Sequence, residues 1–263
     1  MDDLTGRVAV VTGVSRRAGI GFAVARRLLV QGATVVCQSW VPHDAGQPWG
    51  ADPLGADGVV AALGAPAGRV DHLSLDLGDA GAARRLVDRA VERCGRLDIL
   101  VAAHARSSSQ SLADMTADEL DRCWAVNARA SALLVQAFAE RHDGAPGRPG
   151  GRIVLFSSGQ HRGPMPGELP YAISKGAIHQ MTLSLADALA DRGIGLTTVD
   201  PGPTDTGWAA PDLAAELARA FPRGRWTTPD EIAALVAWLV GDDAFAVTGT
   251  VIEAEAGFRR HAP

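Results

Sequence analysis

The sequence predicts an α/β protein whose seven-stranded, mostly parallel sheet is doubly wound, with helices on both faces. Three observations support this fold class. Short apolar stretches alternate with longer stretches of helical periodicity along all 263 residues. The short stretches are continuous Val-, Ile- and Leu-rich runs, typical of parallel strands buried on both faces. The length suits one α/β domain, and no internal repeat or linker is visible, so we expect a single domain over residues 1–263.

The first strand is expected at residues 7–12, where a Val-rich run ends at Gly13. A helix follows, because Phe22, Val24, Leu28 and neighbouring apolar residues recur at helical spacing up to Gly32, and glycine commonly ends helices. The remaining strands are expected at residues 34–37, 70–75, 97–103, 151–158, 194–199 and 250–253. Helices are expected between them at residues 80–94, 117–141, 171–192 and 229–240. Right-handed crossovers through these helices make the sheet parallel.

Three connections are longer than the ~2 to 6 residues usual in such folds, and long loops tend to be functional. They span residues 39–54, 159–170 and 201–228. The last two follow the fifth and sixth strands, and ligands bind at the carboxyl ends of strands in open α/β sheets, so both are candidate substrate walls. Residues 201–228 carry Trp208, Trp226 and an apolar helical pattern at 213–220. We predict a mobile lid there, the alternative being a helix docked permanently for packing or oligomer contact.

Composition excludes several classes of protein. The net charge of −5 provides no basic field for nucleic acid or an anionic membrane surface. The acidic N-terminus leads into a short apolar run that Thr12 and Gly13 close, which fits neither a signal peptide nor a membrane span. The three cysteines are widely spaced, without a CxxC pair, so neither a disulfide framework nor a metal site is expected. These features predict a cytoplasmic protein.

A glycine-rich turn at residues 12–21 joins the first strand to the first helix. Gly13, Gly19 and Gly21 lie where a backbone must approach a phosphate closely, so a pyrophosphate at the helix N-terminus is the functional interpretation. The alternative is that these glycines serve helix–strand packing alone.

The only Tyr and the only Lys of the chain, Tyr171 and Lys175, are four residues apart at the start of a predicted helix. Residues at that spacing share a helix face, so phenol and ammonium can point at one spot. A neighbouring cation would lower the pKa of the Tyr from ~10, toward the range useful for proton transfer. Ser158, at the end of the fifth strand, could donate a hydrogen bond to a carbonyl. The alternative is a surface pair on an amphipathic helix.

Asn127 is the only Asn of the chain and lies in an apolar part of the predicted helix at 117–141. A buried amide that bonds backbone or water is therefore expected, and by itself it would be a structural residue.

Together these residues resemble the short-chain dehydrogenase/reductase family, whose members have a Rossmann fold. The matching positions are Thr12-Gly13 with Gly19 and Gly21, Asp76, Asn127, Ser158, Tyr171-x-x-x-Lys175 and Pro201-Gly-x-x-x-Thr206. The resemblance covers essentially the whole chain and is nearest to a bacterial subgroup described as 3-oxoacyl-carrier-protein-reductase-like. It implies a homotetrameric oxidoreductase that moves hydride between a nicotinamide cofactor and a small-molecule ketone or secondary alcohol.

The resemblance also implies site roles. Tyr171 would be the acid/base, Lys175 would bind the nicotinamide ribose and lower the pKa of the Tyr, Ser158 would hold the substrate carbonyl, and Asn127 would anchor a water in a proton relay. Thr206 would contact the nicotinamide carboxamide and Asp76 the adenine region. The full set of candidate cofactor residues is Gly13, Ser15, Arg16, Arg17, Gly19, Ile20, Gly21, Ser39, Trp40, Asp76, Leu77, Ala103, Tyr171, Lys175, Pro201, Gly202, Thr204 and Thr206. The candidate substrate residues are Gln160, His161, Met165, Glu168 and Trp208.

Two departures from the family pattern stand out. Residues Ala102-Ala-His-Ala105 replace the family's Asn-Asn-Ala-Gly after the fourth strand, so the Asn that tethers neighbouring strands is missing and local stability is in doubt. We expect His104 to be a hydrogen-bonded packing residue rather than a contact of substrate or cofactor. The glycine turn is two residues longer than the common pattern, as in related enoyl reductases, but those space Tyr and Lys more widely.

The cofactor is predicted to be NADP rather than NAD. NAD-preferring enzymes commonly place an acid at the end of the second strand, whereas this chain has Gln38-Ser39-Trp40 and no acid before Asp44. Arg16 and Arg17 could pair with a 2′-phosphate, the alternative being a solvated turn. Trp40 could cover the adenine or pack under the insertion. We expect carbonyl reduction with NADPH, the alternatives being a catalytically silent dinucleotide-binding regulator or a non-redox enzyme of the superfamily.

Overall fold

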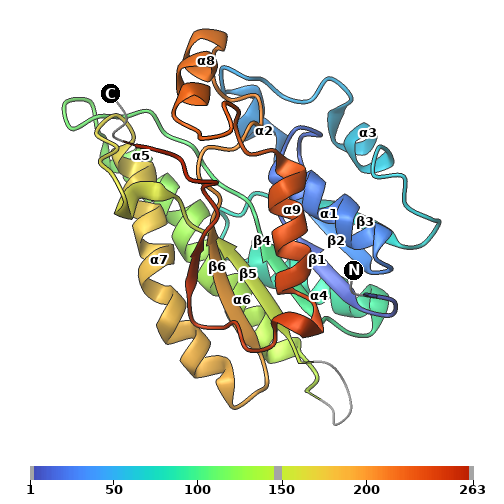
Figure 1. Ribbon diagram of the computed structural model, residues 1–263. Helices are drawn as coiled ribbons and strands as arrows, with labels where there is room; N and C mark the ends of the chain where they lie inside the picture. Colours follow the sequence, from blue (N-terminus) through green and yellow to red (C-terminus); the bar gives the residue numbers. More distant parts are fainter. Residues whose placement is uncertain (1–2, 145–149, 261–263) are drawn as a thin grey trace.

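The computed structural model describes residues 3–144 and 150–260 and places seven parallel strands in one sheet (Figure 1). Their order is β3-β2-β1-β4-β5-β6-β7. The bounds are β1 (Val8–Val11), β2 (Thr34–Ser39), β3 (Val70–Ser74), β4 (Ile99–Ala102), β5 (Arg152–Phe156), β6 (Gly195–Asp200) and β7 (Val251–Glu253). Every neighbouring pair is parallel. The predicted fold is therefore confirmed, and the order reverses between β1 and β4, where open sheets of this kind bind ligands.

Helices cover both faces of the sheet (Figure 1). On one face lie α1 (Ile20–Val30), α9 (Pro229–Leu239) and α3 (Gly55–Ala61); on the other lie α4 (Ala82–Cys94), α6 (Ala130–Arg141) and α7 (Leu169–Ala190). Shorter elements complete the fold: α2 (Val41–Ala45), α5 (Ala117–Cys123), η1 (Trp124–Arg129), η2 (Gly159–His161), α8 (Pro211–Arg219) and η3 (Asp242–Ala244). Among the described residues, no helix is both long and apolar enough to cross a bilayer.

Successive residues of each central strand belong alternately to two separate hydrophobic clusters, one on each face of the sheet. Val11 and Val101 pack with α1 and α9, whereas Val10 and Leu100 pack with α4 and α6. Side chains alternate between the faces of a strand, and helices cover both faces here, so every position of β1 and β4 is buried. This explains why the strands appear in the sequence as continuous apolar runs.

The expected helix at 117–141 consists of α5, the single π-helical segment η1 and α6. Asn127 lies in η1, and π-helical turns often occur at functional sites. The sequence did not predict α2 and α3, which lie in and after the insertion at 39–54.

Residues 201–228 form a closed loop that stands over the carboxyl ends of the strands (Figure 1). A bridge between Thr204 and Thr227 closes its base. The indole of Trp226 is buried and donates to the carbonyl of Ala214, which fixes α8 to the end of the loop. α8 has no buried residue of its own. The helical part of the loop prediction is thus observed, and the mobility of the lid stays a prediction.

Candidate active site

A cavity of about 1320 Å³ opens at the carboxyl ends of the strands, between the glycine turn, the loop at 201–228 and the N-terminus of α7. Typical small-molecule sites have ~300–1,000 Å³, so this volume suits a dinucleotide together with a substrate. Many of the sequence-predicted site residues line it: Gly13, Ser15, Arg16, Gly19, Ile20, Gly21, Trp40, Asp76, Leu77, Ala103, Ser158, Met165, Glu168, Tyr171, Gly202, Thr206 and Trp208.

The glycine turn fits a dinucleotide phosphate. Gly13 has φ +75°, and a Cβ there would lie 2.8 Å from the carbonyl oxygen of Ala103. A Cβ on Gly21 would lie 2.5 Å from the carbonyl oxygen of Gly13, so a larger residue at either position would push the turn apart. Gly19 caps α1 without a side-chain hydrogen bond, and the first turn carries no acid. The N–H groups at this helix N-terminus are therefore left for an anion.

The start of α7 brings Tyr171, Ser158 and Lys175 together. The side chain of Ser158 lies close enough to the phenol of Tyr171 to act on its pKa, and both residues line the cavity. Lys175 lies one turn further on, 2% exposed, with Nζ 5.7 Å from the centroid of the Tyr171 ring. Nζ donates to the carbonyl oxygen of Phe156 at 2.8 Å. Tyr171 faces the cavity, and Lys175 lies behind it, outside the cavity wall.

The expectation that Lys175 lowers the pKa of Tyr171 is wrong for this structure. Burial raises the pKa of Tyr171 to about 12, the Ser158 hydrogen bond opposes this, and the charge of Glu168 adds to it. Burial also lowers the pKa of Lys175 to about 8, against the opposing charge of Asp200. The ammonium lies over the ring face and gives its hydrogen bond to the backbone, so desolvation dominates both groups.

Asn127 is fully buried, as expected, and both atoms of its amide are bound to protein. Oδ1 accepts from the backbone N–H of Arg106 at 2.7 Å, and Nδ2 donates to the carbonyl of Arg106 at 3.0 Å and to Ser174 Oγ at 2.8 Å. The side chain therefore ties the segment after β4 to α7. The backbone carbonyl of Asn127 accepts a hydrogen bond from the hydroxyl of Ser131.

His104 takes over the tether that the family's Asn would supply. Its Nδ1 lies 2.7 Å from Thr12 Oγ1, its Nε2 lies 2.9 Å from the carbonyl oxygen of Val126, and its N–H donates to Thr12 Oγ1. Burial lowers the pKa of His104 to about 3, so the ring is neutral. The Nε2–H then donates to Val126, and Nδ1 accepts from Thr12. The predicted hydrogen-bonded role is observed, and the strand tether is kept. His104 also lines the cavity, so the expectation that it contacts neither substrate nor cofactor stays a prediction.

Other predicted residues do not line the cavity: Arg17, Ser39, Asn127, Gln160, His161, Lys175, Pro201 and Thr204. Arg17 was predicted to contact the cofactor, but it does not line the cavity. The backbone N–H and Nε of Arg17 donate to the carboxylate of Asp52. Burial alone would raise the pKa of Asp52, but these hydrogen bonds outweigh it and lower the pKa to about 2. Ser39 Oγ lies 2.8 Å from His72 Nε2 under the sheet edge. Neither residue lines the cavity.

Gln160 and His161 were predicted to contact the substrate, but neither lines the cavity. Both lie in η2, whose side chains do not face the cavity. His161 lies 3.2 Å from Glu253 at the end of β7. Pro201 and Thr204 act on backbone geometry, because Thr204 Oγ1 bonds the carbonyls of Pro201 and Gly202.

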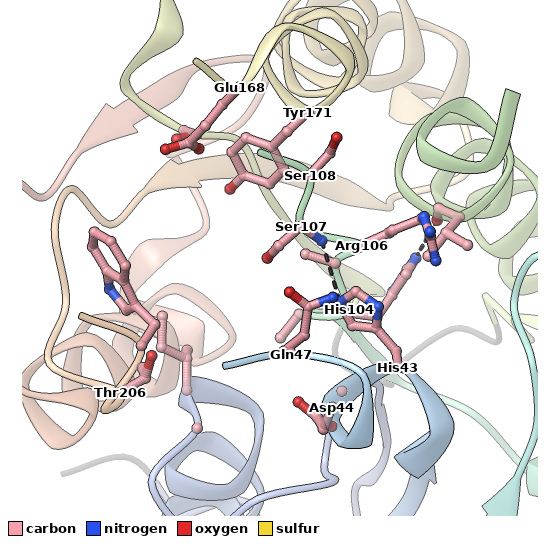
Figure 2. Close-up of a pocket in the computed structure, with 18 of the residues that line it drawn as sticks. His43, Asp44, Gln47, His104, Arg106, Ser107, Ser108, Glu168, Tyr171 and Thr206 are labelled. Carbon is pink, nitrogen blue, oxygen red and sulfur yellow. Dashed lines mark hydrogen bonds between the residues drawn. The ribbon is translucent and has the colours of Figure 1, made fainter. Parts of the chain in front are cut away.

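Several groups of lining residues were not assigned to the site from the sequence, and Asp121, Arg122, Ala125, Val126 and Arg129 of α5 and η1 form one of them. The insertion supplies Gln38, Pro42, His43, Asp44, Gln47, Pro48 and Trp49; the segment after β4 supplies Ala105, Arg106, Ser107, Ser108 and Ser109; the C-terminal segment supplies Phe258 and Arg260. Figure 2 shows His43, Gln47 and Ser107 on one side of the cavity, where Ser107 N–H donates to His43 Nε2. The carboxyl-end rule for parallel strands would have found the segment after β4. The sequence carries no signal for Phe258 or Arg260.

Arg16 links the glycine turn to the lid loop. Its Nη2 donates to the carbonyl of Thr206 at 2.6 Å, and the guanidinium lies 5.7 Å from the ring of Trp49. Trp40 lines the cavity with 37% of its surface exposed, which favours a contact with a bound group over packing under the insertion.

The described part of the chain shows no group of three or more His, Cys, Asp or Glu side chains placed to hold a metal ion.

Comparisons with known proteins agree with the fold. A family model described as "Enoyl-(Acyl carrier protein) reductase" matches residues 13–259. The uncharacterised oxidoreductase YjdA of Bacillus subtilis is 36% identical over 254 residues, covering 97% of both chains. A structure of a short-chain dehydrogenase/reductase from Serratia marcescens superposes with a TM-score of 0.84 at 33% identity, covering 97% of this chain and 99% of that one. The structure of the angucycline C-6 ketoreductase LanV with bound NADP has a TM-score of 0.83 at 33% identity, covering 98% and 97%.

Proposed function

The chain belongs to the short-chain dehydrogenase/reductase family, and on that premise we propose that it reduces a small-molecule ketone to a secondary alcohol with NADPH. One observation carries this proposal. Tyr171 and Ser158 lie together at the wall of a cavity large enough for a dinucleotide, and Lys175 is buried one turn behind the phenol.

In this proposal Tyr171 donates a proton to the carbonyl oxygen of the substrate. The phenol of Tyr171 is protonated at neutral pH, as a proton donor must be, although burial makes it a weaker acid than a free phenol. Ser158 orients the carbonyl by hydrogen bonding, and Lys175 and Asn127 hold α7 and the strand ends in register behind the phenol. A bound nicotinamide cofactor would supply the hydride. The glycine turn, Asp76 and Thr206 would hold that cofactor.

Replacement of Tyr171 by Phe tests the proposal. Phe keeps the ring and its packing but removes the only phenol of the chain, so we expect turnover to fall ~10² to 10⁴-fold. Turnover is followed by the absorbance of the reduced cofactor over a panel of ketones. Cofactor binding and melting temperature should match those of the wild type. A variant that keeps more than half of the wild-type rate would remove Tyr171 from the mechanism.

The NADPH preference now depends on Arg16 alone of the two arginines. Arg16 faces the cavity, whereas Arg17 is paired with Asp52. Asp44 lines the cavity near the end of β2, but its carboxylate accepts a hydrogen bond from the indole of Trp49. The NADP complex of the relative LanV also supports the preference.

We expect kcat/KM with NADPH to exceed that with NADH by at least ~10-fold. Arg16→Ala should lower this ratio and Arg17→Ala, the matched control, should leave it unchanged. If the wild type uses the two cofactors equally, or if Arg16→Ala leaves the NADPH/NADH ratio of kcat/KM unchanged, Arg16 does not bind the 2′-phosphate.

We also propose a homotetramer in a reducing, cytoplasmic setting. Large apolar side chains are exposed on the helical segments that would pair, among them Trp124, Ile173 and Leu183. The three cysteines are free. Sedimentation of the purified chain tests the assembly.

A further inference from the structure

The carboxyl group of Glu168 lines the cavity beside Tyr171 (Figure 2), and the mechanism above leaves it without a task. Glu168 is the N-cap residue of α7, three residues before Tyr171. An N-cap carboxylate usually accepts a hydrogen bond from the first turn of its helix, but this one makes no such bond. Figure 2 shows Glu168 and Tyr171 side by side at the same wall of the cavity.

Within residues 3–144 and 150–260, the Glu168 carboxyl has neither a hydrogen-bond nor an ion-pair partner, although the residue is half-buried. Burial accordingly raises its pKa. The cations that line the same cavity are bound elsewhere in the protein: Arg106 to Glu119, Arg122 to Asp118, Arg260 to Glu255, Arg16 to the carbonyl of Thr206 and Arg129 to the carbonyl of Gly78. A partly desolvated carboxyl without a protein partner is costly unless a ligand satisfies it.

Apolar side chains share the cavity with Glu168. Met165, Trp208, Leu213 and Leu217 line the same cavity. A substrate held by these side chains with its carbonyl at Tyr171 therefore meets one strong hydrogen-bond acceptor next to the reacting group. Glu168 and Tyr171 lie beside each other (Figure 2), and the charge of Glu168 raises the pKa of the phenol.

We propose that Glu168 determines substrate specificity by accepting a hydrogen bond from a hydroxyl or ammonium group carried beside the carbonyl, so that the substrates are donor-bearing, uncharged or cationic ketones and not keto acids. This inference rests on the proposed function. A carboxylate at the same place on the substrate would face Glu168 without a free cation, and like charges at short range repel strongly. A methyl group there would leave Glu168 desolvated and unpaired.

Four aryl ketones that differ only beside the carbonyl test the proposal: propiophenone, α-hydroxyacetophenone, α-aminoacetophenone and phenylglyoxylate. In the wild type we expect the hydroxy ketone to exceed propiophenone by at least ~10-fold in kcat/KM. Glu168→Ala should bring this ratio down by most of that factor. Glu168→Gln keeps an acceptor oxygen but loses the charge, so it should chiefly weaken the amino ketone and raise phenylglyoxylate ~10-fold. Intrinsic reactivity cancels, because each ratio is compared between variants.

Glu216→Gln is the matched control, since Glu216 is exposed on α8 and does not line the cavity. It should leave all four ratios at their wild-type values. Affinity is measured separately, without cofactor, by tryptophan fluorescence with 1-phenyl-1,2-ethanediol and 1-phenyl-1-propanol. The diol should bind more tightly to the wild type and lose that advantage in Glu168→Ala.

The two proposals fail in different ways. If ketones are reduced in a Tyr171-dependent manner but neither Glu168 variant changes the ratios, the specificity role is overturned and the proposed function survives. If no ketone is reduced, the proposed function fails. The role of Glu168 then stands if the diol binds more tightly than 1-phenyl-1-propanol to the wild type only, and it fails if Glu168→Ala keeps that preference.

Discussion

Replacing Lys175 by Met should make the chain more stable at pH 7 while it removes the proposed activity. Lys175 is 2% exposed and has no carboxylate partner within ion-pair distance among the described residues. Its one hydrogen bond runs from Nζ to the carbonyl of Phe156. Met has nearly the same length and shape, so the apolar stem keeps its packing when the charge is removed.

The size of the effect follows from the pKa of Lys175. Burial lowers it from 10.5 to about 8, and each pH unit corresponds to ~1.4 kcal/mol, so keeping this ammonium charged in the folded chain costs about 3 kcal/mol. Losing the hydrogen bond to Phe156 takes back ~1 kcal/mol. The variant should therefore gain about 2 kcal/mol, which for a domain of this size is ~4 to 8 °C in melting temperature.

The gain should depend on pH in a defined direction. Below about pH 8 the lysine is charged in both the folded and the unfolded chain, and the wild type bears the full cost. Between about 8 and 10.5 the unfolded chain still binds the proton and the folded chain does not, so the wild type becomes more stable as pH rises. The advantage of the variant should shrink over this interval.

Urea unfolding of both proteins at pH 7, 8, 9 and 10 measures the difference. Arg219→Met, which removes an exposed cation from α8, is the matched control and should change stability by less than ~0.5 kcal/mol. A Lys175→Met variant less stable than the wild type at pH 7, or a difference that is the same at pH 7 and pH 10, would refute the reasoning.

Two further substitutions test the tether and the lid. His104→Leu removes the hydrogen bonds to Thr12 and Val126 and leaves both partners buried, so we expect a loss of ~2 kcal/mol in urea unfolding, and a loss below ~0.5 kcal/mol would contradict the tether. Trp208→Ala removes the indole that lines the cavity, so KM and substrate preference should both change; if neither does, the loop at 201–228 is not a lid over the substrate.

The sequence predicted the elements whose signal is local. Valine-rich strands buried on both faces and the helix between Phe22 and Gly32 need no knowledge of distant contacts, and the structure has them within a few residues of the expected bounds. The short helices α2 and α3 were not predicted, because a five-residue helix with Pro42 at its start has too few turns for a periodic pattern.

The site was predicted as far as spacing determines it. Spacing of four places Tyr171 and Lys175 on one helix face, but it does not say that the ammonium bonds Phe156 or that burial dominates both groups. Arg16 and Arg17 are adjacent, but only Arg16 lines the cavity, because the side chain of Arg17 bonds Asp52. The sequence does not record that contact. Arg260 reaches the site from the end of the chain, a contact between segments that no local pattern records.

Partnered and unpartnered polar groups are separated across the wall formed by the start of α7. Asn127 behind the wall and His104 at the cavity use the hydrogen-bonding atoms of their side chains on protein partners and hold the strand ends and the helix in fixed positions. On the cavity side, Tyr171 is desolvated and Glu168 has no protein partner. Unsatisfied, desolvated groups lower stability and would be lost from a surface that only packs. Two such groups on one turn of one helix, both at the cavity, are what a site built to bind polar atoms of a ligand requires.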